Sequence, residues 1–321
     1  MASSCSITNG TRSPFFICKK EGTMTPEQGA RFKQATQAID QGQFGEGIRL
    51  LQELDLEVDD FAVNRQLARA LFEDQRFVEA YQVAERHLAD YDQSRQLADF
   101  YVQLALKNQL FIPARQFISL ATHLTDAEGR LVKRAEEQYD RVGAQTLASR
   151  RRQFIHMGDC SFHEQQRRFS EGRMLPLSDY LVGAKFLLRD PDTHPLIKSS
   201  LVQVLQQLRL NEELTVLWLD EKEHPLNIKE LKPLGELTVV KEGERLIAAR
   251  FADQDPLSYQ TYLREFHLQL AFLYPFVELA IEDPDAWVQA LVAYSASGNE
   301  EPILRAHQWQ ERINALVTRL S

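Results

Sequence analysis

The chain has 321 residues, of which 44% are hydrophobic and 26% charged, so it carries enough apolar material for a packed core. Its formal net charge of −9 disfavours nonspecific attraction to nucleic acid or anionic lipid unless a local basic patch exists. Three scattered cysteines do not make a disulfide framework and suit a reducing compartment. The longest apolar stretch, at 268–281, contains Pro275 and Glu278 and is too short for a membrane span, so we interpret it as a buried core helix.

Residues 1–23 differ from the rest of the chain, being rich in Ser, Thr, Gly and Asn with one short apolar run at 15–18. That run is too short for the apolar region of a secretory signal. The segment K-E-G-T before Met24 can be encoded by a purine-rich ribosome-binding sequence. We therefore predict that Met24 is the true start and that residues 1–23 are a translated leader. The alternative is an ordinary disordered N-terminus.

A repeated pattern is present in residues 24–128. An aromatic residue stands three positions before a small one at three places, with intervals of 33 and 34 residues: Phe44 and Gly47, Phe77 and Ala80, and Phe111 and Ala114. A second position recurs with the same intervals: Ala35, Ala68 and Val102 each lie 12 residues before the small residue of their unit. Because small side chains let helix backbones approach where they cross, the spacing predicts two antiparallel helices per unit.

This pattern resembles the tetratricopeptide repeat (TPR) family, with units at about 28–60, 61–94 and 95–128. The second unit carries the resemblance best, matching the family pattern at Leu67, Ala68, Leu71, Phe77, Ala80 and Ala84. It departs from that pattern at Asn64, His87 and Asp92. Ankyrin repeats have a similar length, but their T-P-L-H turn is missing. The resemblance implies a right-handed α-solenoid whose concave groove holds a peptide or a partner's segment.

In the family, the first helix of each unit lines the groove. Carrying that register over gives nine groove candidates in this chain: Phe32, Thr36, Asp40, Arg65, Arg69, Glu73, Asp99, Gln103 and Lys107. The alternative is that these residues form only the polar face of the helices. The lysine and asparagine set with which some family members clamp a C-terminal carboxylate is not reproduced, because Phe32, Thr36 and Arg69 occupy its positions. We therefore do not expect recognition of that tail.

The remainder of the chain continues the helical pattern with one interruption. We expect divergent helical repeats at 129–213, a small β element at 214–252 and a C-terminal helical region at 253–321. The expected strands are 214–219, 237–240 and 246–251, of which the last two flank K-E-G-E-R as a hairpin. Asp-Pro pairs at 255 and 283 are typical of helix starts. This combination is also similar to little-characterised TPR proteins of Gram-positive bacteria, which implies a cytoplasmic bacterial protein.

Motifs for catalysis or cofactor binding are absent: the sequence has no Walker loop, G-x-G-x-x-G, G-x-S-x-G or H-E-x-x-H. Four potential metal ligands do fall within eight positions, at His156, Asp159, Cys160 and His163. Gly158 interrupts the segment and no C-x-x-C partner exists elsewhere. We interpret it as a helix end with a buried thiol and two surface imidazoles, and we predict neither a metal nor a cofactor.

A basic segment stands out in this acidic chain, since residues 141–175 contain seven arginines against three acidic residues. Besides Arg141, these arginines form a candidate basic patch: Arg150, Arg151, Arg152, Arg167, Arg168 and Arg173. Arginine forks suit phosphate and carboxylate, so the patch is a candidate for an acidic partner or an RNA backbone. We favour the alternative, a solvated helix face that pairs with acidic neighbours.

The sequence as a whole predicts a mainly α protein, a TPR-like solenoid with a small β insertion and a C-terminal helical region. We expect a noncatalytic interaction module or assembly scaffold that binds a protein or peptide, with no membrane contact. One alternative is a peptide-binding cytoplasmic sensor or regulator. Another is an RNA- or ribosome-associated factor that acts through the Arg150–Arg173 region.

Overall fold

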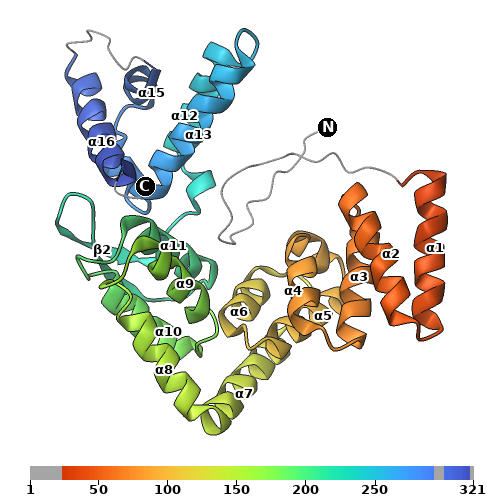
Figure 1. The fold of residues 1–321 in the computed structure, drawn as a ribbon. Helices are drawn as coiled ribbons and strands as arrows, with labels where there is room; N and C mark the ends of the chain where they lie inside the picture. Colours follow the sequence, from red (N-terminus) through yellow and green to blue (C-terminus); the bar gives the residue numbers. More distant parts are fainter. Residues whose placement is uncertain (1–23, 293–299, 319–321) are drawn as a thin grey trace. The chain divides into compact units, whose positions relative to one another are not determined.

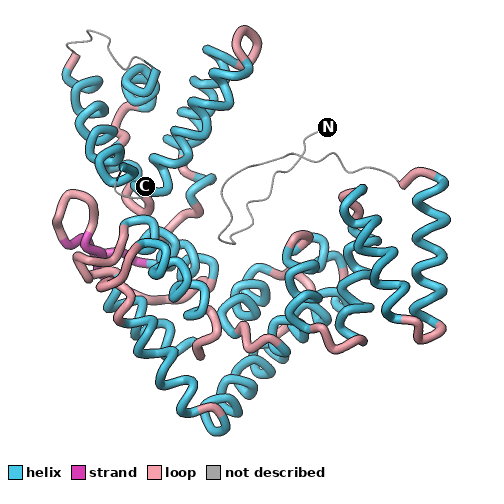
Figure 2. Tube along the Cα trace, in the orientation of Figure 1, coloured by secondary structure: helices cyan, strands magenta, loops and turns pink. Residues whose placement is uncertain are grey.

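The computed structural model describes residues 24–292 and 300–318, which are mainly α-helical with a small two-stranded sheet (Figures 1 and 2). The chain forms two compact units. Unit 1 holds the described residues up to Arg150 together with Gly172–Leu177, and unit 2 holds Arg151–Glu171 and the described residues from Ser178 onward. The predicted leader at 1–23 and the last residues of the C-terminal region, 319–321, lie outside the described residues.

Unit 1 is a succession of helices in which, from α1 to α7, each packs against the next along the chain (Figure 1). In addition, α1 packs on α3 and α5 packs on α7. The predicted helix pairs of residues 24–128 are present as α1 with α2, α3 with α4 and α5 with α6. The helices are α1 Pro26–Asp40, α2 Phe44–Glu57, α3 Phe61–Glu73, α4 Phe77–Glu85, α5 Arg95–Lys107, α6 Phe111–Leu120, α7 Asp126–Val142 and α8 Ala144–Ile155, which continues into unit 2.

Small residues make the close contacts between these helices. Ala35, Ala68 and Val102 are all 0% exposed. A Cβ atom added at Gly47 of α2 would lie 2.5 Å from the Ile39 side chain and 3.0 Å from the Ala35 carbonyl oxygen. The pair α1/α2 therefore packs at a distance that only glycine permits at this position.

Two of the departures from the family pattern make polar contacts that tie segments of unit 1 together. Asn64 is fully buried, donates to the Val83 carbonyl at 2.7 Å and accepts from the Tyr91 hydroxyl at 3.3 Å. Asp92 accepts from the backbone N–H of Thr122 at 2.9 Å. The buried amide is hydrogen-bonded through both its oxygen and its nitrogen, as burial of a polar group requires.

Unit 2 contains further helices and the hairpin. Helix α11 packs on α13, α12 packs on α13 and α15, and α15 packs on α16. The elements are α9 Phe162–Gly172, α10 Leu177–Leu187, α11 Pro195–Gln207, β1 Glu213–Leu217, β2 Glu223–Asn227, α12 Thr238–Phe251, α13 Pro256–Leu273, α14 Val277–Ala280, α15 Pro284–Val292 and α16 Glu301–Thr318.

The predicted β element is only partly correct. The strand expected at 214–219 is present as β1, and it forms a two-stranded sheet with β2 (Figure 2). The pairing is antiparallel, with Glu213 opposite Asn227 and Leu217 opposite Glu223. The strands expected at 237–240 and 246–251 are wrong, because α12 runs from Thr238 to Phe251 and contains both stretches except Leu237, its N-cap. The glycine between them, Gly243, serves close packing and not a turn, since an added Cβ would lie 2.3 Å from the Phe266 ring.

The helix expected across 268–281 is also wrong in extent. Helix α13 ends at Leu273, Tyr274 is extended with φ −63° and ψ 135°, and the chain resumes as the short α14. The residue before a proline is disfavoured in helical conformation, so Pro275 ends the helix. The Asp-Pro helix starts are confirmed, because α13 begins at Pro256 and α15 at Pro284.

A buried amide organises the first loops of unit 2. Gln165 is 3% exposed, and its side-chain nitrogen lies 3.2 Å from the carbonyl oxygen of Gly158 and 3.1 Å from those of Cys160 and Asp192. Its oxygen accepts from the backbone N–H of His194 at 2.9 Å. One side chain thereby joins the loop before α9 to the loop before α11.

His194 itself is the N-cap of α11. Its Nδ1 atom accepts from the backbone N–H of Leu196 at 3.2 Å, which places the hydrogen of the neutral ring on Nε2. The ring centroid lies 4.3 Å from that of Phe162 and 5.8 Å from that of Phe272. Burial among these rings lowers the pKa of His194 to about 4.

The glycines of α2 give a matched test of the helix crossing. We expect Gly47→Ala to lower the free energy of unfolding by about 1 kcal/mol, because its methyl group overpacks the contact with α1. Gly45→Ala, in the same helix and with nothing within 4 Å of its added Cβ, should raise that free energy by about 0.5 kcal/mol. Urea unfolding followed by far-ultraviolet circular dichroism measures both, and equal effects of the two substitutions would contradict the packing described.

The buried ring of His194 predicts acid sensitivity of unit 2. The folded state excludes a proton that the unfolded chain binds below a pKa of about 6.5, so stability falls as the pH drops from about 6.5 toward about 4. Between pH 7 and pH 5 the loss should be about 1 kcal/mol, allowing for partial exposure of the ring.

Tryptophan fluorescence during urea unfolding isolates this effect, because Trp218, Trp287 and Trp309 all lie in unit 2. His194→Asn keeps an acceptor for the helix cap but does not titrate. We expect its unfolding free energy to change less between pH 7 and pH 5 than that of the native chain. An unchanged pH dependence would show that another group is responsible.

Candidate functional site

A hollow between α5 and α7 is the candidate site in unit 1. Its volume is about 340 Å³, at the lower end of the range of small-ligand pockets. Its walls come from two helices that pack against each other. The lining residues are Asp99, Val102 and Gln103 of α5, and Ala127, Glu128, Leu131 and Arg134 of α7.

The hollow has both apolar and polar walls. Val102 is fully buried, whereas Leu131 keeps 44% of its surface exposed. Gln103 is exposed and makes no side-chain hydrogen bond to another described residue. The arrangement can therefore accept an apolar group and also offer an amide to a polar one.

One acidic side chain of the hollow is already engaged. Glu128 accepts from the Thr125 backbone N–H at 2.8 Å, closing the capping box that starts α7, and from Arg95 at 2.7 Å. The Thr125 N–H, followed by its hydroxyl, lowers the pKa of Glu128 to about 2. Glu128 is thus ionised at neutral pH, and its oxygens link the start of α7 to Arg95 of α5.

The other two charges of the hollow are less committed. Asp99 lies 3.7 Å from Arg95, a distance too long for a hydrogen bond. Arg134 is exposed and forms no ion pair with any residue that the structure describes. A ligand group that meets Arg134 does not have to displace an internal partner.

The structure brings two of the nine predicted groove residues, Asp99 and Gln103, into the hollow. Phe32 packs on the core of unit 1, and Thr36 donates its hydroxyl to the Phe32 carbonyl at 3.0 Å. Asp40 and Arg65 are exposed, on α1 and α3.

The remaining groove candidates contact neighbours on their own or the adjacent helix. Arg69 pairs with Glu73 at 3.2 Å, and Lys107 lies 5.2 Å from the ring centroid of Phe77. The α7 half of the hollow, including Leu131 and Arg134, is missed by the sequence prediction. A signal was present, because the sequence predicted divergent helical repeats from residue 129 onward.

The predicted basic patch does not behave as one surface of free cations. Arg150 and Arg173 belong to unit 1, and the other four arginines belong to unit 2. Arg150 donates to the Tyr139 hydroxyl at 2.9 Å, and Arg151 pairs with Asp179 at 2.6 Å. Arg152 is exposed and forms no ion pair with a described residue.

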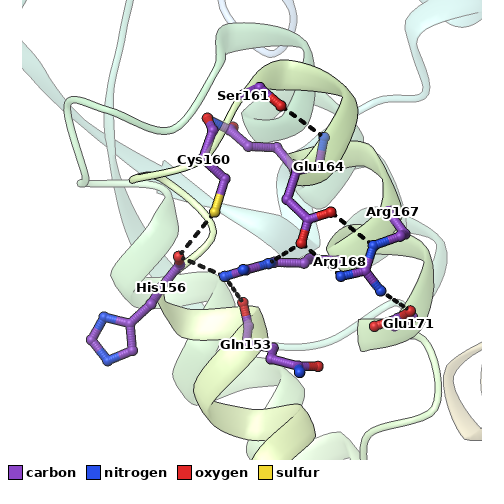
Figure 3. A network of polar contacts seen from close by, with 9 residues as sticks. Gln153, His156, Cys160, Ser161, Glu164, Arg167, Arg168 and Glu171 are labelled. Carbon is purple, nitrogen blue, oxygen red and sulfur yellow. Dashed lines mark hydrogen bonds and ion pairs between the residues drawn. The ribbon is translucent and has the colours of Figure 1, made fainter.

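Arg168 joins α9 to the end of α8, and Arg167 pairs within α9 (Figure 3). Arg168 donates to Glu164 at 2.7 Å and to the carbonyl of His156, just past the end of α8, at 3.1 Å. Arg167 pairs with Glu164 at 2.6 Å and also with Glu171. Hydrogen bonds from Arg167 and then Arg168 lower the pKa of Glu164 to about 2.

Arg173 is drawn into unit 1. Its guanidinium lies 3.3 Å from Glu85, which also accepts from the Tyr81 hydroxyl, and Tyr101 donates to the Tyr81 oxygen at 3.1 Å. The backbone carbonyl of Arg173 accepts from the N–H of Ile112 at 3.1 Å. Burial raises the pKa of Tyr81 to about 12. The contacts of five of the six patch residues thus fit the interpretation that these arginines pair within the protein.

The cluster at 156–163 does not assemble a cation site. Within the described part of the chain, no group of three or more His, Cys, Asp or Glu side chains converges to hold a metal ion. The two imidazoles, His156 and His163, are exposed as expected, but the expected buried thiol is wrong, because Cys160 is only partly buried. Its sulfur lies 3.9 Å from the His156 carbonyl oxygen (Figure 3).

Comparisons with known proteins give no relative: no family model matches the chain, and no curated protein or solved structure does. A search of the described helices finds none that is long and apolar enough to cross a bilayer.

The arginines of α8 and α9 give a matched stability test. Arg168→Ala removes donors from the end of α8 and from Glu164, so we expect unit 2 to lose about 1–2 kcal/mol of unfolding free energy. Arg152→Ala should change it by less than about 0.5 kcal/mol. Urea unfolding followed by tryptophan fluorescence distinguishes the two, and equal losses would mean that Arg168 is not the specific link.

Proposed function

We propose that the protein is a noncatalytic interaction module of the bacterial cytoplasm. Unit 1 acts as a right-handed α-solenoid of TPR-like repeats, and the side formed by the first helix of each pair holds a partner protein's segment. The observation that carries this proposal is the hollow between α5 and α7, at which Asp99 and Gln103 stand where the repeat register placed groove residues.

A second observation supports binding by the first helices: a segment of the chain itself covers part of the second helices. The segment Gly172–Leu177 packs against second helices of the pairs, through Glu85 of α4 and the N–H of Ile112 in α6. Leu175 of that segment is fully buried. The chain itself thus occupies a surface of the second helices, whereas the hollow lies between the first helices α5 and α7.

The chemistry of the hollow favours binding over catalysis. Its lining contains no Ser, Thr, Cys, His or Lys side chain that would serve as a nucleophile beside a base. Its one strongly shifted acid, Glu128, has its pKa lowered and is held in a helix cap. These side chains offer a ligand apolar contact area, the amide of Gln103 and the charge of Arg134.

The RNA-binding alternative receives less support. Phosphate contacts need exposed cations, and most arginines of the basic segment bind internal carboxylates, hydroxyls or carbonyls. A sensor that binds a free peptide would use the same hollow as the scaffold. The two hypotheses are distinguished by whether the chain captures a partner protein or only a peptide.

A crosslinked pull-down from bacterial lysate tests the proposal. The full chain serves as bait beside a groove variant with Arg69→Glu and Lys107→Glu. The matched control carries Arg49→Glu and Arg141→Glu, two charge reversals at exposed cations outside the predicted groove. We expect at least one protein to be captured by the native chain and the control and reduced about tenfold or more with the groove variant.

Circular dichroism must first show that both variants fold. Equal capture by all three chains would sink the proposal for unit 1. Stabilisation of the chain by a peptide pool, with no protein captured, would instead favour the sensor.

A further inference from the structure

We propose that the hollow between α5 and α7 selects an extended peptide in which an apolar side chain is followed or preceded closely by Asp or Glu. This inference rests on the proposed function and names the chemistry of its ligand. Arg134 receives the carboxylate, the gap beside Leu131 and Val102 receives the apolar group, and Gln103 meets the peptide backbone.

The charge preference follows from which ionic groups are free. Glu128 accepts hydrogen bonds from the Thr125 backbone N–H and from Arg95, so this carboxylate already has a cation of the protein beside it. Asp99 forms only a loose ion pair with the same Arg95 guanidinium, at 3.7 Å, so both carboxylates of the hollow share one cation of the protein. Arg134 has no internal carboxylate among the described residues, and a guanidinium binds a carboxylate with two parallel hydrogen bonds.

The neighbouring surface of α5 has the same preference. Lys107 follows Gln103 by one helical turn, on the same face, and it forms no ion pair with any described residue. Its ammonium group lies over the Phe77 ring and is exposed. A second acidic residue in the ligand therefore meets a second cation along α5.

The apolar part of the preference comes from Leu131. This side chain keeps 44% of its surface exposed while lining the hollow beside the fully buried Val102. Covering it removes apolar surface from water and adds favourable free energy to the charge contact. The volume of about 340 Å³ suits a few residues of an extended chain and not a folded domain.

Gln103 accounts for an extended backbone. Its exposed amide can donate and accept at once, which is the pattern that one peptide unit of an extended ligand requires.

An array of capped nonapeptides tests the inference. Each peptide carries one Leu and one Glu, separated by one to four positions in a Gly-Ser background, and a second array replaces Glu by Lys. The full chain is applied at low salt, and the best binders are then titrated by fluorescence anisotropy. We expect the Glu peptides to bind and the matched Lys peptides to bind about tenfold more weakly or not at all.

A charge exchange identifies the receiving residue. Arg134→Glu should weaken the best Glu peptide about tenfold or more and strengthen the matched Lys peptide. Arg130→Glu is the control, since Arg130 is exposed on the same helix but does not line the hollow. That control should change binding less than about twofold.

Several outcomes would overturn the inference: no binding from the Glu array, equal binding of Glu and Lys peptides, or equal effects of the two arginine reversals. Its failure is distinguishable from failure of the proposed function. If a protein partner is lost with Arg69→Glu and Lys107→Glu while the arrays show no preference, the groove function stands and the acidic-peptide rule is wrong.

Discussion

The close approach of helix backbones at small side chains is the constraint on which the rest of unit 1 depends. Ala35, Ala68 and Ala80 are completely buried, and Gly47 cannot carry even a methyl group without meeting α1. Each such contact fixes which face of a helix points at its partner. The opposite face of each helix is then left toward solvent. Asp99 and Gln103, four residues apart on α5, therefore lie on one side of that helix. The hollow is thus a consequence of how α5 is held.

Polar side chains complete what the small residues begin. At positions where the resembled family prefers other residues, this chain has Asn64, bonded to α4 and to Tyr91, and His87, whose ring nitrogens lie 3.0 Å from Asp90 and 3.1 Å from Asp59. These groups bond to α4 and to the segments that flank the helices. Buried polar groups need partners in definite places, so they favour one arrangement of the segments over its alternatives. The departures from the family pattern can therefore be understood as replacements of one kind of link by another.

Much of the helical organisation could be predicted because it depends on local spacing. The interval between Phe44, Phe77 and Phe111 located the helix pairs, and the Asp-Pro pairs located two helix starts. The strands expected at 237–240 and 246–251 failed because short runs of Val, Ile and Ala suit a buried helix as well as a strand. Gly243 strengthened the error: in the structure it makes room for Phe266, a contact 23 residues away that no local pattern contains. The partner of β1 was missed because E-H-P-L-N has Pro225 and no clear alternation.

The same distinction between local and distant contacts governs the charges. The sequence shows the arginines of the basic segment but not the residues that they contact in the fold. Arg173, for example, contacts Glu85, which is 88 residues away in the sequence. Arg168, by contrast, binds the end of the preceding helix. Arg134 was not singled out, although the structure leaves it free at the edge of the hollow. In an acidic chain with many ion pairs, the useful measure of a binding surface is therefore the charge that folding leaves uncompensated. By that measure the hollow beside Arg134 leaves an uncompensated cation, whereas five of the six patch arginines have partners within the protein, which is why the proposal places the binding surface on the first helices of unit 1.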